Sequence, residues 1–509
     1  MSIRNACRAS ASLLALAASF APVNAEDVTL TLRGGGLTVI GELVAADAAS
    51  FVIRSDKFGM MALESAKFEC NGPSCPKPLI PSLGIHGSNT IGAQLMPNTV
   101  ERFAEEEGFV AEKVVGADPE EVVFKFSDAS GKDVASIDIK SHGSGTAPKS
   151  LIEGKAQIGA MSRPIKEDEA KAVADAGVPL KTHVFALDGI VVFVSPKNPV
   201  KTLSLEQIAK IFSGDIKDWK DVGGNPGPIH IYARDAKSGT FDTFNTLVLS
   251  PLKLKLSPGA KRFESNHDLS DETARDPNGI GFSGFAYIRN AKPLSVASNC
   301  GIVSTPDVFS VKTEEYPLSR RLYLYSGKAG PLGDKLIAYA LSDKAQDIIS
   351  EAGFINQHID LQTFDQQAGR VWPAFLVAEK DFSFALMRDL TADVKSGKRL
   401  SVNFRFHRNS AVLDDKAMQD VPRLARFLKS DANGKDLLLL GFTDGTGAFE
   451  TNKALSLNRA TSFKNALVAE GVPANKITVK GYGSLLPVGC NTSDAGQSAN
   501  RRVEVWMKD

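Results

Sequence analysis

The chain has 509 residues, and its 59 basic and 59 acidic residues give a formal net charge of zero at neutral pH. Charged residues make up 23% of the chain and hydrophobic residues 43%, values typical of folded globular proteins and far from those of disordered chains. The length exceeds what one ordinary core supports, so we expect two or three domains. The balanced charge argues against nucleic acid as a partner, so any anion-binding site must be local.

The first 25 residues are typical of a signal peptide. Arg4 and Arg8 form a basic start, residues 13–18 form an apolar stretch, and residues 23–25 offer a small-residue cleavage site. A membrane anchor is the alternative, but the apolar stretch is shorter than the roughly 20 residues that a spanning helix needs. We therefore expect export to the periplasm.

Two cysteines predict a short disulfide loop. Cys70 and Cys75 bracket residues 71–74, which form a turn sequence, and the expected compartment is oxidising. Zinc is the alternative, but four residues separate the pair and no second Cys or His pair lies nearby. Cys300 and Cys490 stand alone, and the sequence leaves their pairing open. We expect no metal and no cofactor.

Hydrophobic patterning predicts that the mature chain is a multidomain α/β protein. Residues 26–76 alternate between apolar and polar side chains and predict a small β-rich module. In residues 79–361 strands alternate with amphipathic helices, which indicates α/β architecture. Residues 362–399 are predicted to be a partly helical connector, and residues 400–509 show a compact βαβαβ pattern, with helices around 421–428 and 456–470.

Three segments place glycine and small polar residues where helices should begin: residues 87–92, 143–146 and 237–240. Helix starts expose unpaired N–H groups and a partial positive charge, so three of them converging would hold a tetrahedral anion. Side-chain hydroxyls add donors, and Arg234 could add a forked, charged contact. Simple helix caps are the alternative for each segment. The predicted anion-binding residues are Ser88, Asn89, Thr90, Ser144, Gly145, Thr146, Arg234, Ser238, Gly239 and Thr240.

Two enzyme motifs resemble these segments and fail on inspection. A phosphate-binding Walker loop needs glycine before Lys149, where Pro148 stands, and a nucleophile elbow needs glycine where His142 and Thr146 stand. The sequence therefore predicts a binding protein and not an enzyme.

A family resemblance strengthens the prediction. It rests on residues 85–90, 158–164, 202–208, 211–219, 234–240 and 278–282. On these motifs, residues 79–361 resemble the PstS-like family of periplasmic phosphate-binding proteins. The resemblance implies a type II periplasmic-binding-protein fold, with residues 79–187 and 275–361 in one lobe and those between in the other. It implies phosphate or a similar oxyanion as ligand, adds Ser162 to the ligand residues, and makes an ABC permease a candidate partner.

The position after Ser162 departs from the family pattern. Many members place Asp there, and this chain has Arg163. A carboxylate acceptor favours protonated phosphate over sulfate, so the substitution bears on specificity. Asp235 is the alternative acceptor. Arg163 itself is expected to be either a ligand residue or a surface residue.

A second site is predicted near the C-terminus. Asp444 ends a strand at a glycine-rich turn, and Arg459 lies on the next helix. A carboxylate beside a guanidinium suits a zwitterion, since one binds an ammonium group and the other a carboxylate. A structural salt bridge is the alternative.

Residues 400–507 resemble the OmpA C-terminal, peptidoglycan-binding family. The resemblance rests on residues 441–447, 455–460, 481–483 and 500–504. It implies that Asp444 and Arg459 clasp the diaminopimelate of the peptide stem, that Asn452 assists, and that Arg501 and Arg502 help to shape the pocket. Such a domain would hold the protein at peptidoglycan or the outer membrane.

Two other functions remain as alternatives. The receptor-like domain could have lost its ligand and serve wall attachment or protein contacts, for which Arg163 and the extra β module are the motivation. A phosphatase using a serine of the anion site is the other, but the seven histidines are scattered and no metal-ligand cluster supports it.

Overall fold

The computed structural model describes residues 27–46, 50–65, 67–75, 80–376, 383–406, 410–432 and 434–508. Contacts divide the chain into two compact units, Met1–Ile80 and Pro81–Asp509, which are described separately. The expected signal peptide, residues 1–25, lies outside the described residues. Within those ranges, no helix has the length and apolar character required to cross a bilayer.

The first unit is an antiparallel sheet. Its strands are β1 (Asp27–Leu32), β2 (Thr38–Ala46), β3 (Ser50–Ser55), β4 (Gly59–Glu64) and β5 (Phe68–Asn71). They pair in the order β4-β3-β2-β1-β5, and alternate residues such as Val28, Leu30 and Ile53 are buried. Cys70 and Cys75 form the predicted disulfide, so zinc binding by this pair is wrong.

The second unit begins with an α/β part. Its strands are β6 (Ser82–Gly87), β7 (Val110–Val115), β8 (Glu121–Ser127), β9 (Asp133–Lys140), β10 (Ile158–Met161), β11 (Lys181–Val194), β12 (Thr202–Ser204), β13 (His230–Arg234), β14 (Lys261–Phe263), β15 (Gly279–Gly284), β16 (Lys292–Pro293), β17 (Ser295–Ala297), β18 (Val303–Ser304) and β19 (Ser319–Ser326). Its helices are α1 (Asn89–Gly92), α2 (Leu95–Glu106), α3 (Ala147–Ile152), α4 (Glu167–Asp175), α5 (Leu205–Ser213), α6 (Gly239–Phe244), α7 (Asn266–Arg275), α8 (Val308–Lys312), α9 (Gly330–Ala340) and α10 (Asp343–Glu351).

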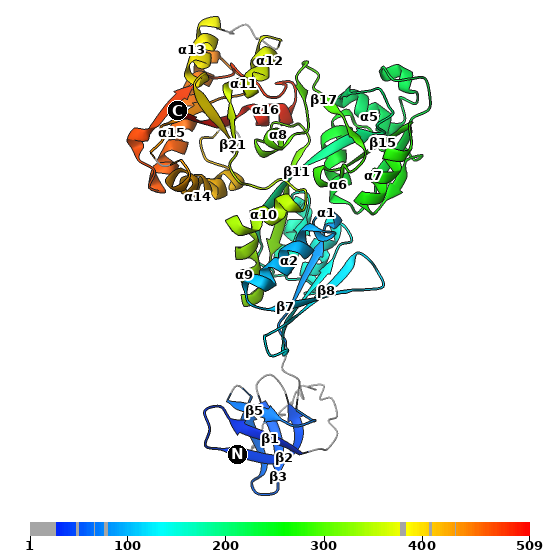
Figure 1. Cartoon of the computed structure of the whole chain (residues 1–509), viewed down its shortest axis with the longest axis vertical. Coiled ribbons are helices and arrows are strands. Elements are labelled where there is room, and N and C mark those ends of the chain that lie inside the picture. The colour runs from blue at the N-terminus through cyan, green and yellow to red at the C-terminus, as the bar shows by residue number, and fades with distance from the viewer. Residues whose placement is uncertain are drawn as a thin grey trace, which may run out of the picture. The chain divides into compact units, whose positions relative to one another are not determined.

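One long sheet runs through this part in the order β14-β13-β15-β11-β19-β10-β6-β9-β8-β7. The first half of β11 pairs with β19, and its second half pairs with β15. Figure 1 shows β11 passing from the group of helices around α1 and α10 to the group around α5, α6 and α7. The strand therefore connects two bodies of the α/β part.

Two hydrophobic cores define these bodies. The core of the first lobe draws mainly on residues 83–186 and 322–354, and the core of the second lobe on residues 184–318. The expected boundary, which put residues 275–318 in the first lobe, is wrong for most of that segment. Ile280 belongs to the second core because β15, which contains it, pairs with the second half of β11.

Helix α5 shows how the sequence sets these elements. Ser204 Oγ accepts from the Gln207 amide at 3.0 Å, and Gln207 Oε1 accepts from the Ser204 amide at 2.8 Å, which caps the helix start reciprocally. Ile208 and Phe212 lie on the buried face. Gly214 ends the helix in the left-handed region, with φ of 84°.

The C-terminal part completes the second unit. Its elements are β20 (Leu361–Thr363), α11 (Phe364–Gln367), α12 (Val371–Leu376), α13 (Phe384–Val394), β21 (Gly397–Arg405), α14 (Asp415–Ser430), β22 (Leu437–Gly441), α15 (Phe449–Ala469), β23 (Ile477–Gly481), α16 (Asp494–Asn500) and β24 (Arg502–Lys508). The sheet order is β20-β21-β24-β22-β23. Helix α15 begins at Phe449, earlier than the expected start near residue 456, and carries Arg459 in its middle.

Candidate functional site

The three predicted helix starts converge between the lobes. Thr90 at the start of α1 and Thr240 at the start of α6 lie on different lobes, and their Oγ1 atoms are 3.0 Å apart. Ser144 Oγ lies 3.3 Å from Ser162 Oγ and accepts from the Ser162 amide at 3.0 Å. All four side chains are almost fully buried. We call this group of hydroxyls and helix starts the cradle.

Gly239 allows the second lobe to approach this closely. A Cβ atom at this position would lie 2.2 Å from Ser144 Oγ and 2.6 Å from Ser162 Oγ, distances that real side chains do not adopt. The first turn of α6 therefore lies directly against the hydroxyls of the first lobe.

Two other predicted cradle residues use their hydroxyls in local hydrogen bonds. Ser238 Oγ caps α6 by accepting from the Phe241 amide at 3.3 Å, and Thr146 Oγ1 donates to the Gly143 carbonyl at 2.8 Å. Ser88 is buried, and its amide donates to the Ala160 carbonyl at 2.8 Å. The helix-cap interpretation is thus confirmed for Ser238. The three segments nevertheless lie close together, which separate caps would not require.

Arg234 is buried at the edge of the cradle. Its guanidinium donates to Asn266 Oδ1 and, at 3.5 Å, to Asn89 Oδ1. Asn266 Nδ2 also donates to Asn89 Oδ1 at 2.9 Å, so this network joins the lobes. Burial lowers the pKa of Arg234 to about 10; to a smaller extent Asp235 raises this pKa and Arg320 lowers it, so the group remains charged at neutral pH.

A second buried arginine was not predicted. Arg320 Nη1 donates to Thr240 Oγ1 at 2.8 Å, and its Nη2 lies 2.6 Å from Asp188 Oδ2. Both members of the ion pair are buried, on hinge strands β19 and β11. The sequence did hold one signal for a buried cation here. Asp188 is a single charged residue within the apolar run of β11, and a buried charge needs a partner of opposite charge.

Arg163 is not a surface residue, which was one of its two expected roles, and its role as a ligand residue stays a prediction. It is only 4% exposed, so the surface interpretation is wrong. Its guanidinium donates to both carboxylate oxygens of Glu169, at 2.6 and 2.7 Å, and its Nε donates to Asp242 Oδ2 at 2.8 Å. Since Asp242 lies in α6, Arg163 forms an ion pair between the lobes.

The alternative acceptor, Asp235, pairs with residues next to it in the chain, and its Oδ2 lies 3.7 Å from Arg234 Nη2. Its Oδ1 accepts from the Lys237 amide at 2.7 Å, and its side chain is 29% exposed. The carboxylate therefore shapes the turn before α6.

The predicted C-terminal site has a different pairing from the expected one. Asp444 Oδ2 accepts from Arg501 Nη1 at 2.9 Å, and Asp444 Oδ1 accepts from the Thr446 amide at 3.0 Å. Burial alone would raise the pKa of Asp444, but these hydrogen bonds lower it below its usual value. Asn452 Nδ2 donates to the Thr446 carbonyl at 3.0 Å, which holds the same turn. We call residues 441–447 the acidic turn.

Arg459 is buried nearby with unused hydrogen-bonding capacity. Its Nε donates to the Ser410 carbonyl at 3.1 Å, and its guanidinium lies 5.5 Å from the centre of the Phe406 ring. Its Nη1 is buried and has no hydrogen-bond partner among the residues that the structure describes. Burial, and next the charge of Arg501, lower the pKa of Arg459 to about 10.

Arg502 contacts the acidic turn, with its guanidinium 4.4 Å from the centre of the Phe442 ring. It is fully buried and pairs with Glu504, at 2.6 Å between Nη2 and Oε1. Its guanidinium also belongs to a cluster of buried charges with Glu504 and Glu315, and its expected role in shaping the pocket stays a prediction.

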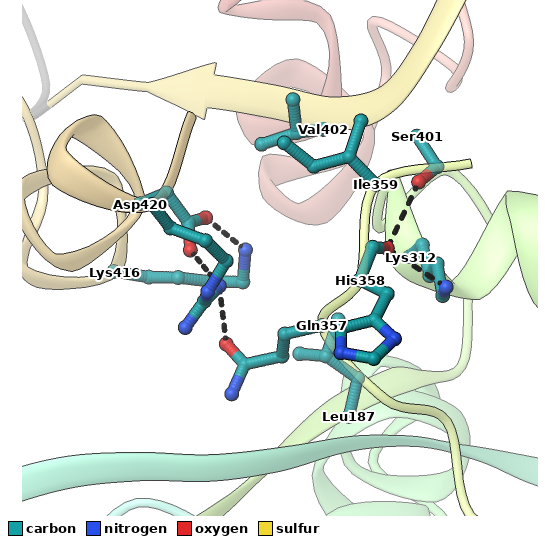
Figure 2. A pocket seen from close by; sticks show the side chains of 10 residues that line it. Leu187, Lys312, Gln357, His358, Ile359, Ser401, Val402, Lys416 and Asp420 are labelled. Carbon is teal, nitrogen blue, oxygen red and sulfur yellow. Dashed lines mark hydrogen bonds and ion pairs between the residues drawn. The ribbon is translucent and has the colours of Figure 1, made fainter. Parts of the chain in front are cut away.

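The α/β part and the C-terminal part meet at a small pocket. Figure 2 shows Gln357 beside Asp420 and Lys416, with Lys312 donating to the His358 carbonyl at 2.8 Å. The cavity measures about 10 Å³, room for a single water molecule and for no larger ligand. This pocket is part of a packed junction.

A model of the PBP superfamily domain matches residues 118–344. The phosphate-binding protein PstS of Pseudomonas aeruginosa is 31% identical over 239 residues, covering 43% of this chain and 73% of that protein. The chain belongs to the PstS-like family of phosphate-binding proteins. This PstS-like protein is also 31% identical over 231 residues to PstS of Bacillus subtilis, covering 43% of this chain and 71% of that one.

Among solved structures, the PstS-like protein is similar to an ABC-type phosphate transport receptor from Vibrio cholerae. The identity is 25%, the match covers 54% of this chain and 99% of that one, and the TM-score is 0.41. A model of the OmpA family matches residues 405–501 of the PstS-like protein. Both predicted families and the multidomain α/β fold class are thus confirmed.

Proposed function

We propose that the protein binds phosphate or a similar oxyanion in the cradle between its lobes. The observation that carries the proposal is the approach of α6 to the first lobe at Gly239, which brings Thr240 beside Thr90 and the backbone of Gly239 against the hydroxyls of Ser144 and Ser162. Hydroxyls and the first amides of a helix are the donors that a tetrahedral anion requires. The PstS relatives bear the name phosphate-binding protein, which favours phosphate.

A binding role is favoured over catalysis. The cradle hydroxyls bond to one another and to Arg320. Among the described residues, no histidine hydrogen-bonds Ser88, Ser144, Ser162 or Ser238, so a serine nucleophile would lack the usual base. An ABC permease remains a proposed partner of the loaded receptor.

Calorimetry on the full chain with phosphate, sulfate and arsenate tests the anion site. Gly239→Ala should lower the affinity at least tenfold, because the new methyl group would collide with two hydroxyls. Gly116→Ala is the matched control, since its Cβ would meet its nearest neighbour at 3.6 Å. If none of the three anions gives a heat of binding, the proposal that this domain is a receptor is contradicted. Unchanged thermal stability across a phosphate series would then favour the alternative of a receptor-like domain without ligand.

We also propose that the C-terminal domain binds the diaminopimelate of peptidoglycan and so holds the exported protein at the cell wall in the periplasm. The support is the acidic turn beside Arg459, whose buried Nη1 can donate to a ligand carboxylate. Asp444→Ala and Arg459→Ala should each abolish sedimentation with diaminopimelate-containing sacculi. Arg388→Ala, which removes an 80% exposed side chain, should not. Retained sedimentation in both site variants would contradict the assignment.

A further inference from the structure

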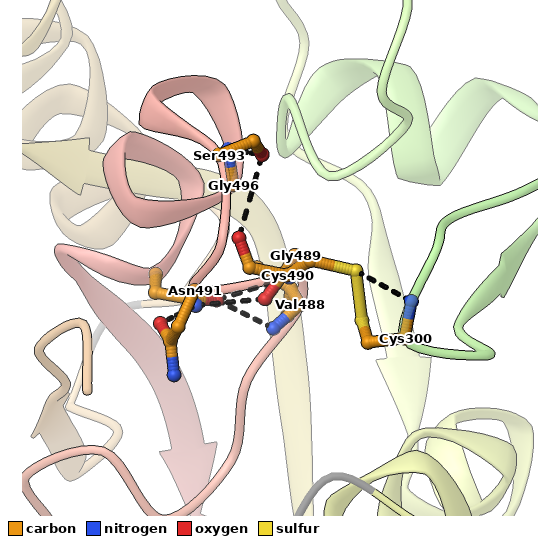
Figure 3. The surroundings of a disulfide bond; sticks show 8 residues. Cys300, Val488, Gly489, Cys490, Asn491, Ser493 and Gly496 are labelled. Carbon is orange, nitrogen blue, oxygen red and sulfur yellow. Dashed lines mark hydrogen bonds between the residues drawn. A yellow bond between two sulfur atoms is a disulfide. The ribbon is translucent and has the colours of Figure 1, made fainter. Parts of the chain in front are cut away.

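A disulfide joins the second lobe to the C-terminal part. Cys300 lies between β17 and β18, and Cys490 lies between β23 and α16, 190 residues further along the chain. The Cys300 amide also donates to Cys490 Sγ at 3.1 Å. Figure 3 shows the bond running from the second lobe directly into the loop that precedes α16.

The loop that holds Cys490 also holds the acidic turn. Asn491 Oδ1 accepts from the Gly445 amide at 3.0 Å and from Asn500 Nδ2 at 2.8 Å. Asn500 Oδ1 in turn accepts from the amides of Val488, at 2.7 Å, and Gly489, at 3.0 Å. The residue directly after the disulfide cysteine therefore fixes the residue directly after Asp444.

A second attachment joins the second lobe to β21 and β24 of the C-terminal part. Glu315 of the second lobe accepts from Arg399 Nη1 at 3.2 Å and from Asn403 Nδ2 at 3.0 Å. It also lies 3.5 Å from the Nε of Arg502, the chain neighbour of Arg501. Glu315 and its partners are largely buried. The disulfide therefore belongs to a packed interface and does not join two separate bodies.

We propose that the Cys300–Cys490 disulfide and Asn491 are positioning residues for the wall-binding site, so that the second lobe of the receptor forms its outer support. The chain Cys300, Cys490, Asn491, Gly445 fixes the backbone beside Asp444. Neither cysteine contacts the proposed ligand residues, so both act through Asn491. The inference rests on the proposed binding of diaminopimelate.

Calorimetry of the full chain with a diaminopimelate-containing muropeptide tests the inference. Removing the bond in the double variant Cys300→Ser, Cys490→Ser should weaken muropeptide binding about tenfold. The matched control is Cys70→Ser, Cys75→Ser, which removes the other disulfide and should leave binding unchanged. Phosphate affinity, measured on the same samples, should be unchanged in both and shows that the α/β part is folded.

Two variants of Asn491 separate positioning from general stability. Asn491→Ala removes the acceptor for the Gly445 amide and should also weaken binding about tenfold. Asn491→Asp keeps that acceptor and should restore most of the affinity. If the wild-type chain binds muropeptide and all variants bind equally well, the inference is overturned while the proposed function stands. If the wild-type chain does not bind, the proposed wall attachment fails and the inference falls with it.

Discussion

Arg163 and Asp242 lie on opposite lobes, and Arg163 Nε donates to Asp242 Oδ2 at 2.8 Å. Arg163 also holds Glu169 of its own lobe in a forked pair. Asp242 lies in α6, the helix whose first turn contributes to the cradle. Separating the two lobes at this point must therefore break this ion pair, which stabilises the arrangement in which they are in contact.

Asp242→Asn should weaken anion binding about tenfold, because it leaves the buried Arg163 with one carboxylate partner in place of two. Isothermal calorimetry with phosphate measures the change. Asp175→Asn is the control, since Asp175 is 65% exposed and pairs with Lys171 within α4. Equal affinities for the wild type and Asp242→Asn would show that the pair does not contribute to closure.

His142 predicts a pH dependence of anion binding. Its Nε2 lies 3.1 Å from Glu121 of the first lobe, and its Nδ1 lies 3.5 Å from Glu264 of the second. Burial lowers the pKa of His142, but hydrogen bonds to both glutamates outweigh it and raise the pKa above its usual value of about 6.5. Protonated His142 bridges the lobes, so its contribution is complete below about pH 6.5 and is lost as the pH rises through the raised pKa.

The ratio of wild-type to His142→Gln affinity for phosphate isolates this effect, because the ionisation of phosphate itself affects both proteins equally. The ratio should exceed one at pH 6 and approach one by about pH 9. A ratio that does not vary with pH would exclude His142 as a bridge. Asp118 also lies 3.8 Å from His142 Nε2 and contributes to the same raised pKa.

Glu315→Gln should destabilise the second unit by roughly 3–5 kcal/mol, because it removes a buried carboxylate and leaves Arg399 and Arg370 with an unbalanced charge. Urea unfolding measures the loss. Glu206→Gln, at an exposed helix pair with Lys210, is the control and should cost less than about 0.5 kcal/mol. Similar losses in both variants would contradict the importance of the buried cluster.

Acid should remove the same stabilisation. Burial opposes the charge on Glu315, but Arg370 and Arg399 outweigh burial and lower its pKa far below that of an ordinary glutamate. A lowered pKa means that the stabilising contribution is complete above about pH 4.3 and is lost as the pH falls towards the lowered value. The midpoint in urea should therefore fall more steeply below pH 4 for the wild type than for Glu315→Gln.

Wall binding should persist in mild acid. The pKa of Asp444 is lowered by Arg501 and the Thr446 amide, so its carboxylate stays charged below the usual aspartate pKa of about 3.9. Sedimentation with sacculi should therefore be constant from pH 7 to about pH 5. A loss of binding centred above pH 5 would show that another group controls the interaction.

Local signals in the sequence predicted much of the fold and of both sites. Glycine and hydroxyl residues at helix starts can be recognised from neighbouring residues alone. The same holds for the spacing between Asp444, at the end of a strand, and Arg459, on the following helix. The cradle residues Thr90, Ser144 and Thr240 were accordingly predicted and are brought together, although their role as ligands stays a prediction.

Pairings between residues far apart in the chain could not be predicted from the sequence. Nothing in the spacing of Cys300 and Cys490 indicates their bond, because the loop it closes has no preferred length. Arg163 was assigned by analogy with an aspartate, and its true partners depend on how α6 approaches the first lobe. Charged residues such as Arg399 and Glu504 resemble surface residues in a one-dimensional pattern, although both are fully buried.

The Cys300–Cys490 bond has a mechanical consequence. Tension applied at the acidic turn by an attached wall would travel through Asn491 and the disulfide into the second lobe, and would bypass the 190 residues between the cysteines. Strands β11 and β19, which both lobes share, would then carry the load onward to the first lobe. The disulfide would thus let the α/β part bear a pulling force while the C-terminal domain that binds the wall stays folded.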